Sequence, residues 1–485
     1  MDDQEFRQRA HQLSDWMAEY IETVGSRRIV PDVAPGALRA ALPASAPEHP
    51  ESFDDIFAAF QDTIVPGMTH WNHPGWFGYF PANHSPPSIL AEMLVAAMGA
   101  QCMSWQTSPA ATELEQVVMR WLGELLGLGG VFTGVIQDTA STSTFSAIVS
   151  ARERALNALE VDGDPRLRGA AMGSFTLYVS SEAHSSVLKG ARMAGFCDAQ
   201  VRQVPLQAVA PGELDGRSLD PAALDEMIAS DLASGWRPLF VTATVGTTST
   251  TGVDPVRAIS EVCQARGLWL HVDAAYAGAC ALLDECRPHF DGWELADSVV
   301  VNPHKWLFVN FDCSAYFVRE PRDLLAAFSM TPEYLRTAHD DEVVNFRDWG
   351  PQLGRRFRAL KLWFVLRAYG AEGVRALLRE HNRMAAELAD WVDAHPTLRR
   401  VAPTPFALVC FRWAPEGASD ADADTLNEEL MRRVNARGDV FMTHTRVDGR
   451  YTLRMSVGQW RTGDEDVARA RRHLDDVLSD LEVSR

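Results

Sequence analysis

Apolar residues near the start of the chain recur with the period of a helix. They succeed one another at alternating steps of four and three residues: Phe6, Ala10, Leu13, Met17, Tyr20 and Val24. This spacing places them on one face of a helix, which needs an apolar surface to pack on. We expect that surface to belong to the main domain or to another copy of the chain. A Pro-rich stretch at residues 31–50 separates this helix from the rest of the chain.

From about residue 86 helical stretches alternate with short apolar runs that are rich in β-branched residues. Four such runs have the length and composition of buried strands: residues 176–179, 239–245, 268–272 and 299–301. This alternation is typical of an α/β domain, in which helices wrap a mixed, mostly parallel sheet.

Past about residue 370 the pattern changes to helix, strand at 406–411, helix, hairpin and a last charged helix. The dipeptide Asp448-Gly449 predicts the hairpin turn between arms at residues 440–443 and 451–457. We therefore predict a small C-terminal α+β domain at residues 373–485. The large domain is expected at 86–372 and an N-terminal helical segment at 1–85.

Composition and charge exclude several classes of function. The chain has 485 residues, of which 46% are hydrophobic and 23% charged, as in ordinary globular proteins. Its 65 acidic and 45 Lys or Arg residues give a net charge of -20. This charge repels phosphate backbones and anionic membrane surfaces, so neither nucleic acid nor a membrane is expected as a partner. No apolar stretch approaches the roughly 20 residues that span a bilayer.

The N-terminus and the cysteines indicate a cytoplasmic protein. The chain opens Met1-Asp2-Asp3, which is acidic where a secretory signal is basic. Its seven cysteines are scattered and form no Cys-x-x-Cys pair. We expect reduced thiols, with neither a disulfide framework nor a thiolate zinc site.

Two pairs of residues are candidate metal ligands. His271 with Asp273 is one pair, and His70 with His73 is the other. The second pair lies among Pro and aromatic residues and lacks the helical spacing that zinc sites prefer. We predict no metal site.

Reactive side chains come directly after two of the predicted strands. Lys305 comes just after the strand at 299–301, and a lysine at the mouth of a buried strand is costly unless it is neutral, paired or covalently used. Schiff-base chemistry is one such use. Asp273 comes after the strand at 268–272, at the edge where α/β folds collect ligands, and its carboxylate suits a cationic ring nitrogen.

Two further elements complete a pattern. Residues 137–144 place hydroxyls and backbone N–H groups before a helical run, which suits a phosphate. His184 comes after a third strand and offers an imidazole face to a planar ligand. Each element alone has an ordinary explanation as a helix cap, a surface lysine or a core histidine. Together, in this order, they are typical of a pyridoxal phosphate site.

Longer stretches carry a resemblance to a known family. They are PGMTHW, SPAATELE, AHSSV, GTTSTTGVDP, HVDAAYAG, NPHKWLFVNFDCS and GRRFRALKLWFVLRAYG. Over residues 66–370 the chain closely resembles the group II pyridoxal phosphate-dependent decarboxylases, and within them the aromatic-L-amino-acid decarboxylases. The resemblance implies the fold-type I PLP-dependent transferase architecture, pyridoxal 5'-phosphate as cofactor and a homodimer whose subunits share their active sites.

The resemblance also assigns roles to residues. It makes Lys305 the lysine that binds the cofactor covalently, Asp273 the partner of the pyridinium nitrogen and His184 the residue that stacks on the ring. His304 completes a catalytic set with these three and Tyr334. The residues that fall where the family holds the cofactor are Ala140, Ser141, Thr248, Asp273, Ala275, Asn302, His304 and Lys305.

The substrate pocket departs from the family pattern at several positions. Ala82 stands where animal enzymes carry Thr, Asp138 replaces a Gly and Met103 replaces a Phe. Gly354 stands where plant relatives tend to have Gly for indole substrates, which favours a bulky ring. His184 also faces the substrate, and aromatic walls are expected from Trp71, Phe77, Tyr79, Phe80 and Trp105. Tryptophan, phenylalanine, tyrosine and DOPA all stay open as substrates.

Tyr334 bears on the product. In the family a tyrosine on a mobile loop protonates the substrate Cα after CO2 leaves, whereas a Phe commonly stands there in aromatic aldehyde synthases. The resemblance therefore implies conversion of an aromatic L-amino acid to the arylalkylamine and CO2. The alternatives are an aldehyde synthase, or a catalytically inactive binding protein on the same fold.

Overall fold

The fold is organised around a seven-stranded sheet. The computed structural model describes residues 1–159, 164–210, 213–330, 339 and 342–483. Within these residues the strand order is β1-β7-β6-β5-β4-β2-β3. Only β7 runs antiparallel to its neighbours, so the predicted mixed, mostly parallel sheet is confirmed. The strands are β1 Thr133–Gln137, β2 Phe175–Ser180, β3 Val201–Val204, β4 Arg237–Thr244, β5 Trp269–Asp273, β6 Ser298–Val301 and β7 Ser314–Val318.

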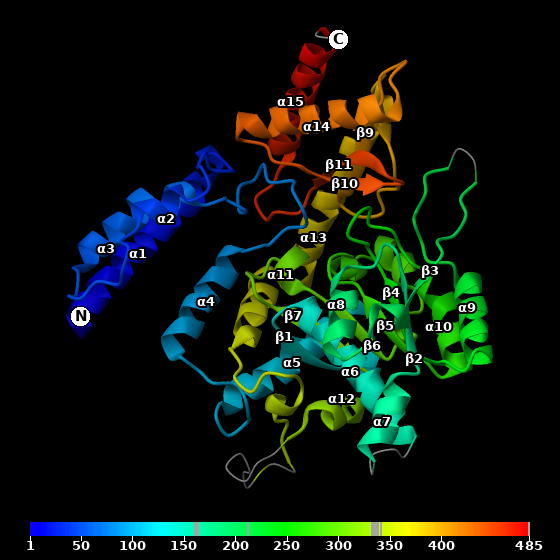
Figure 1. Cartoon of the computed structure of the whole chain (residues 1–485). Helices are drawn as coiled ribbons and strands as arrows, with labels where there is room; N and C mark the ends of the chain where they lie inside the picture. Colours follow the sequence, from blue (N-terminus) through cyan, green and yellow to red (C-terminus); the bar gives the residue numbers. More distant parts are fainter. Residues whose placement is uncertain (160–163, 211–212, 331–338, 340–341, 484–485) are drawn as a thin grey trace.

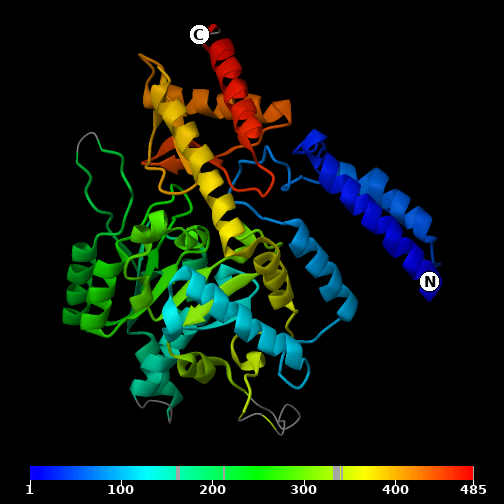
Figure 2. The same ribbon diagram turned by 180° about the vertical axis from the view of Figure 1, so that it is seen from behind.

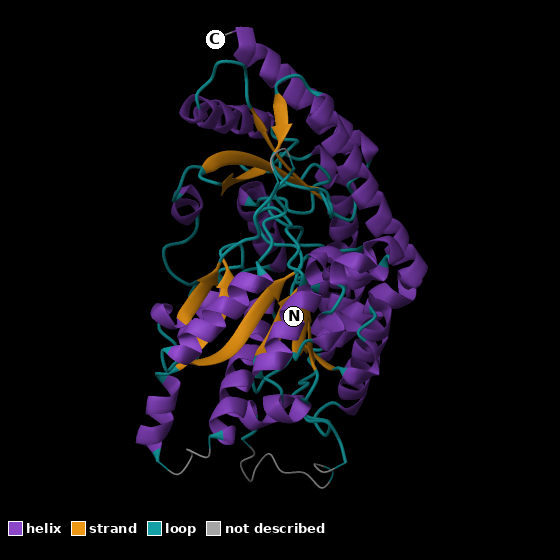
Figure 3. Cartoon of the chain, turned by 90° about the vertical axis from the view of Figure 1, so that its right-hand side faces the viewer, coloured by secondary structure: helices purple, strands orange, loops and turns teal. Residues whose placement is uncertain are grey.

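Helices cover both faces of this sheet (Figure 3). Every residue of β5, β6 and β7 is buried, which is why these strands are apolar runs without polar alternation. The helices of this domain are α5 Pro109–Leu126, α6 Ala140–Ala158, α7 Pro165–Met172, α8 Ser186–Met193, α9 Pro221–Ala233, α10 Val256–Arg266, α11 Pro303–Trp306 and α12 Pro321–Phe328.

The sequence pattern missed β1, β3 and β7. β1 and β7 are only five residues long, and β1 contains Gly134, which lowers its strand propensity. β3 lies at the edge of the sheet, and only one of its four residues is buried. β1 and β3 therefore lack the apolar run on which the prediction rests, whereas β7 is a fully buried apolar run that the pattern overlooked.

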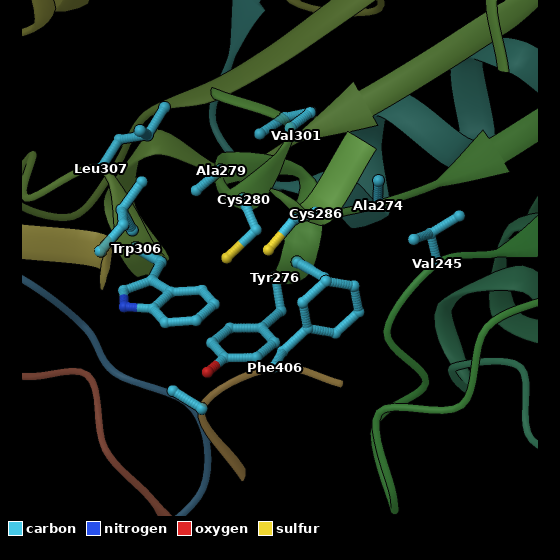
Figure 4. Packing of buried hydrophobic residues seen from close by; sticks show 14 of the residues in the cluster. Val245, Ala274, Tyr276, Ala279, Cys280, Cys286, Val301, Trp306, Leu307 and Phe406 are labelled. Atoms are coloured by element: carbon cyan, nitrogen blue, oxygen red, sulfur yellow. The ribbon is translucent and has the colours of Figure 1, made fainter. Parts of the chain in front are cut away.

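The 3-10 segments η6 Ala277–Leu282 and η7 Asp284–Phe290 come after β5 and pack into the main core. Figure 4 shows this region, where the rings of Tyr276 and Trp306 lie together. They stack with 4.6 Å between centroids and 5° between planes. This packed layer supports the loops at the end of β5 and β6.

The small C-terminal domain holds a four-stranded antiparallel sheet in the order β10-β11-β9-β8. The predicted turn at Asp448-Gly449 is confirmed, and both residues have positive φ, 50° and 78°. The predicted first arm at 440–443 was wrong, because Phe441 bridges to Trp76 of the N-terminal segment and the strand begins only at Thr443. The elements are β8 Leu398–Arg400, β9 Leu408–Trp413, α14 Asp420–Arg437, β10 Thr443–Val447, β11 Arg450–Ser456 and α15 Asp464–Val483.

The long helix α13, Arg358–Ala394, connects the two sheets (Figure 2). It is interrupted at Gly370, whose φ of 63° and ψ of 170° are not helical. This interruption lies near the boundary predicted at residue 372. The exact domain limits stay a prediction.

The N-terminal segment lies along one side of the molecule (Figure 1). The predicted helix forms α1, Asp3–Thr23, and none of its residues is buried. It packs on the segment around α3, where Trp16 meets Phe57 and Phe60 at 6.2 and 5.2 Å between ring centroids. The other helices here are α2 Ala37–Ala41, α3 Phe53–Ala59 and α4 Pro86–Met98. Among the described residues, no helix has both the length and the apolar character of a membrane span.

Candidate active site

A cavity of about 210 Å³ lies at the carboxyl ends of the central strands. Many residues that the sequence pattern and the resemblance single out line it: Phe80, Ala140, Ser141, His184, Thr248, Asp273, Ala275, Asn302, His304 and Lys305. Ligands of open α/β sheets bind at this edge, because the loops after several strands converge there. The structure therefore places these residues around one space.

Lys305 reaches the cavity from α11, which comes directly after β6. Its Nζ lies 5.4 Å from the centroid of the Phe80 ring. Desolvation lowers the pKa of Lys305, although the negative charge of Asp273 raises it in part. A lowered pKa increases the share of neutral amine, which is the nucleophilic form.

Asp273 is the last residue of β5, between β4 and β6. It is 5% exposed, and its Oδ1 accepts the N–H of Ala275 at 3.0 Å. That bond turns the carboxylate toward the loop after the strand. The site thus has a fixed negative charge opposite the lysine, suited to a cationic ring nitrogen.

His184 comes after β2, at the mouth of the cavity. Its Nδ1 accepts the backbone N–H of Ser186 at 3.2 Å and lies 2.8 Å from Ser186 Oγ. Because Nδ1 is an acceptor, the imidazole proton belongs on Nε2. Desolvation lowers the pKa of His184, with a smaller contribution from the positive charge of Lys305. His184 is therefore a neutral ring with a defined tautomer.

His304 and Asn302 are fixed by backbone and hydroxyl groups. His304 Nδ1 accepts the N–H of Cys313 at 2.9 Å, and burial lowers the pKa of His304 to about 3. Asn302 Oδ1 accepts a hydrogen bond from Ser314 Oγ at 2.7 Å. Both side chains are almost fully buried. They form a rigid wall that holds no charge near neutral pH.

The opposite end of the cavity is suited to an anion. Thr139 is the N-cap of α6, and its side chain makes no capping hydrogen bond to the N–H groups of this first turn. Thr248 contributes from a turn that begins at Gly246, whose φ is 86° and whose added Cβ would lie 2.5 Å from the Cβ of Ala277. The buried Arg454 holds this turn by donating to the carbonyls of Thr248 and Ser249, at 2.7 and 2.9 Å.

These residues fit pyridoxal phosphate. The cavity offers an amine, a carboxylate, a flat imidazole and a helix N-terminus, and Ala275 leaves room beside Asp273. Among the described residues, the buried Thr244 Oγ1 on the cavity wall has no hydrogen-bond partner. Such an oxygen is expected where a polar ligand binds.

Sequence reasoning singled out Thr139 within residues 137–144 but missed several other contributors, namely Thr244, Gly246, Tyr276 and Arg454. Tyr276 stacks on Phe80 with 3.8 Å between centroids, so it forms part of the cavity floor. Gly246 is the first residue of GTTSTTGVDP, a stretch that carries the family resemblance. Arg454 lies on β11 of the small domain, and no local signal connects it to the cavity.

Several residues predicted for the substrate pocket do not line this cavity, among them Trp105 and the fully buried Phe77. Ala82, Met103 and Gly354 lie outside it, and Gly354 is exposed. Trp71 and Tyr79 stack on each other at 5.5 Å and are 38% and 53% exposed. Their assignment stays a prediction. Tyr334 lies outside the described residues.

The histidines considered as metal ligands have other partners. His271 is buried, with Nδ1 2.9 Å from Ser298 Oγ, and His70 Nδ1 lies 2.7 Å from Tyr20 Oη. His73 accepts the N–H of Gly75 at 2.9 Å. Within the described part of the chain, no three His, Cys, Asp or Glu residues group as metal ligands.

Comparison with known proteins extends these observations over nearly the whole chain. The pyridoxal-dependent decarboxylase conserved domain matches residues 35–414. The chain is 40% identical to a tryptophan decarboxylase from Camptotheca acuminata, covering 97% of this chain and 94% of that protein. It is 37% identical to phenylacetaldehyde synthase from Arabidopsis thaliana, covering 99% and 97%. The crystal structure of Oryza sativa TDC with PLP and tryptamine matches with a TM-score of 0.94 and 36% identity, over 99% of both chains.

Proposed function

The chain belongs to the family of pyridoxal-dependent decarboxylases and shares their fold and their cofactor, and we propose that it converts an aromatic L-amino acid into the arylalkylamine and CO2. One observation carries this proposal. Lys305, Asp273, His184 and the N-terminus of α6 surround one cavity. This is the set of groups that pyridoxal phosphate requires.

Each residue has a distinct role in the proposed reaction. Pyridoxal phosphate, when bound, supplies the electron sink for the bond that breaks at the substrate Cα. Lys305 would hold the cofactor covalently and release it to the substrate amine. Asp273 would keep a proton on the ring nitrogen, and His184 would lie against the ring as a neutral imidazole. Ala140, Ser141 and Thr248 would bind the phosphate.

Orientation decides which bond at Cα breaks. The walls of the site have to hold the substrate carboxylate out of the plane of the cofactor ring. His304 and Asn302 would contribute to this because buried hydrogen bonds fix both side chains. A fixed wall costs little reorganisation when charge develops during the reaction.

An aromatic substrate is supported by the lining of the cavity and by the relatives. Among the described residues that line the cavity, the only Lys or Arg is Lys305, which the cofactor uses. Within this cavity a second carboxylate, as in glutamate, would therefore be buried without a cationic partner, at a cost of several kcal/mol. The relative from Camptotheca acuminata is named for tryptophan decarboxylation. We propose a bulky ring, consistent with the missing side chain at Gly354.

We assign the amine as product because a tyrosine stands at position 334. A tyrosine hydroxyl is a suitable general acid for the substrate Cα. Aldehyde synthesis is the second candidate, and the similarity to phenylacetaldehyde synthase favours testing it.

A homodimer is part of the proposal. α1 buries none of its residues within one chain, and α4 exposes large apolar side chains: Leu90, Met93, Leu94 and Met98. α4 lies between the sheet domain and the helical pair α1 and α3 (Figures 1 and 2). Exposed apolar surface of this extent is typical of a subunit interface. We propose that a second copy covers it and that Trp71, Tyr79, Ala82, Met103 and Gly354 reach the substrate in the dimer.

We also propose a cytoplasmic location. All seven cysteines are free thiols, and six of them are buried. Free thiols are the rule in a reducing compartment.

The proposal is tested by incubating the cofactor-loaded protein with tryptophan, phenylalanine, tyrosine, DOPA, histidine and glutamate. Amine, aldehyde and hydrogen peroxide are measured together. We expect amine from one or more aromatic substrates, with little peroxide. Faster turnover of glutamate than of every aromatic substrate would refute the substrate class, and aldehyde as the main product would favour the second candidate.

A further inference from the structure

Asn83 connects three distant parts of the chain. It is 1% exposed and lies before α4, in the N-terminal segment. Its Nδ2 donates to the carbonyl of Lys305 at 2.6 Å and to the carbonyl of Gly458 at 2.8 Å. Its Oδ1 accepts the N–H of Trp460 at 2.9 Å. The amide therefore uses both donor hydrogens and its oxygen, all on backbone groups.

The contact with Lys305 acts on the end of a very short helix. α11 has four residues, and the carbonyls of His304 and Lys305 lie at its C-terminal end, where a helix leaves carbonyls without internal partners. The backbone N–H of Asn83 donates to the His304 carbonyl at 3.0 Å. Asn83 thus binds two consecutive carbonyls of the helix that carries the lysine.

The chain on either side of Asn83 reinforces this arrangement. Two residues further on, the N–H and the Oγ of Ser85 both donate to the carbonyl of Phe308, at 3.1 and 2.7 Å. Pro81 packs so closely on Gly458 that an added Cβ there would lie 2.8 Å from Pro81 Cγ. The segment around Asn83 is therefore held against both the lysine helix and the small domain.

We propose that Asn83 is a positioning residue that fixes the backbone of Lys305 relative to the small domain. This inference rests on the proposed role of Lys305. A lysine that binds a cofactor and then releases it needs a backbone anchor that does not move with its side chain. Asn83 supplies that anchor without contacting the reacting atoms, and its bonds to Gly458 and Trp460 make the anchor depend on the docking of the small domain.

Asn427 provides a matched control. It is fully buried in the small domain and makes the same pattern of bonds, donating to the carbonyls of Trp413 and Ala423 at 2.8 and 2.7 Å and accepting the N–H of Trp413 at 2.8 Å. Loss of either amide leaves buried backbone groups unpaired, so Asn83→Ala and Asn427→Ala should lose stability to a similar degree. Only the first should affect Lys305.

The test compares Asn83→Ala, Asn83→Asp, Asn427→Ala and Lys305→Ala. The first readout uses cofactor-free protein: the rate at which acetic anhydride acetylates Lys305, measured by mass spectrometry relative to Lys189. We expect the Asn83 variants to change this rate by about 2- to 10-fold. In loaded enzyme they should lower kcat by about 10- to 10²-fold with KM nearly unchanged. Asn427→Ala should change neither quantity while lowering the unfolding temperature.

If Asn83→Ala matches Asn427→Ala in labelling rate, kcat and stability, Asn83 is only structural and the inference is overturned. Should Asn83→Ala fail to fold, Asn83→Ser keeps one donor hydrogen and allows the same comparison, with a smaller effect on both readouts expected. Lys305→Ala separates the two proposals. If that variant still binds pyridoxal phosphate covalently and turns over substrate, the proposed function has failed, whatever the Asn83 variants show.

Discussion

Tyr79 and Phe80 are neighbours in the sequence but belong to two different aromatic clusters. Phe80 lies on Tyr276 beneath the cavity, and Tyr276 in turn stacks on Trp306, at 3.8 and 4.6 Å between centroids. Tyr79 is 53% exposed and stacks on the exposed Trp71. The floor of the cavity is thus complete within one chain, whereas the second cluster still has a free face.

The difference indicates how the site is divided. The residues that line the cavity would hold the cofactor, and we call them the cofactor half of the site. They lie at strand ends and are fixed by buried hydrogen bonds within one chain. Most residues assigned to the substrate half lie outside the cavity of that chain, and only Phe80 and His184 of that set line it among the described residues. We infer that one chain suffices to build the cofactor half and that the substrate half depends on a second copy. Substitutions can therefore test the two halves separately.

The largest effect is expected from Lys305→Ala, which removes the covalent anchor of the cofactor half. We expect turnover to fall by about 10⁴-fold, the upper end of what one proton-transferring group contributes. The visible absorption band of the loaded protein should disappear, and borohydride should no longer fix the cofactor to the chain. Unchanged turnover would contradict the assignment of Lys305. Lys189→Ala, a change to an exposed lysine nearby, serves as the control.

The second prediction concerns Tyr334, which lies outside the described residues. Tyr334→Phe removes one hydroxyl and should lower amine formation by about 10²- to 10⁴-fold, because a general acid is lost. Aldehyde and hydrogen peroxide should rise at the same time. An unchanged amine rate would show that another group protonates Cα.

The origin of these assignments shows what the sequence can and cannot predict. Lys305 and Asp273 were predictable because each comes after an apolar run, and the end of a buried strand is where an α/β sheet binds ligands. The helix N-terminus at the cavity was predictable from the hydroxyls before a helical run. Such signals are local, and they also identified the α/β class of the large domain.

The remaining contributors act over long distances and through the backbone. Arg454 binds two carbonyls more than 200 positions away, and Asn83 binds Gly458 across 375 positions. Neither contact leaves a spacing or a composition in the sequence. Hydrogen bonds to backbone groups also place few demands on the identity of the accepting residue. The positions of Met103 and Gly354 outside the cavity were likewise not predictable, since the resemblance implies shared active sites but does not say which residues each chain would contribute.

The third prediction tests whether the substrate half depends on a second copy of the chain. Leu94 of α4 is 46% exposed, so Leu94→Asp should change the stability of the single chain by only about 0.5 kcal/mol. In a dimer the new carboxylate would be buried without a partner, which costs several kcal/mol and should weaken association by about 10²-fold or more. Analytical ultracentrifugation measures the effect.

Leu232→Asp is the matched control, because Leu232 is 48% exposed but lies on α9, on the other side of the molecule (Figure 1). It should leave association unchanged. If the Leu94 variant loses turnover together with association while still binding the cofactor, the division between the two halves is supported. A wild-type chain that is monomeric and fully active would refute it.

The smallest effect is expected from Ser186→Ala. This substitution removes one of the two hydrogen bonds that fix the tautomer of His184 in the cofactor half. The N–H of Ser186 already donates to Nδ1, so the hydroxyl at 2.8 Å is a second donor to the same nitrogen. Its loss should lower kcat/KM by about 2- to 10-fold, the value of one hydrogen bond. A bond donated to Nδ1 favours the neutral ring and so lowers the pKa of His184, which means that its removal raises this pKa. The acid limb of the kcat/KM profile should therefore move to higher pH.

Ser185→Ala is the control, because Ser185 caps α8 without a side-chain hydrogen bond. A shift to lower pH would show that Nδ1 carries the proton and that the tautomer assigned to His184 is wrong.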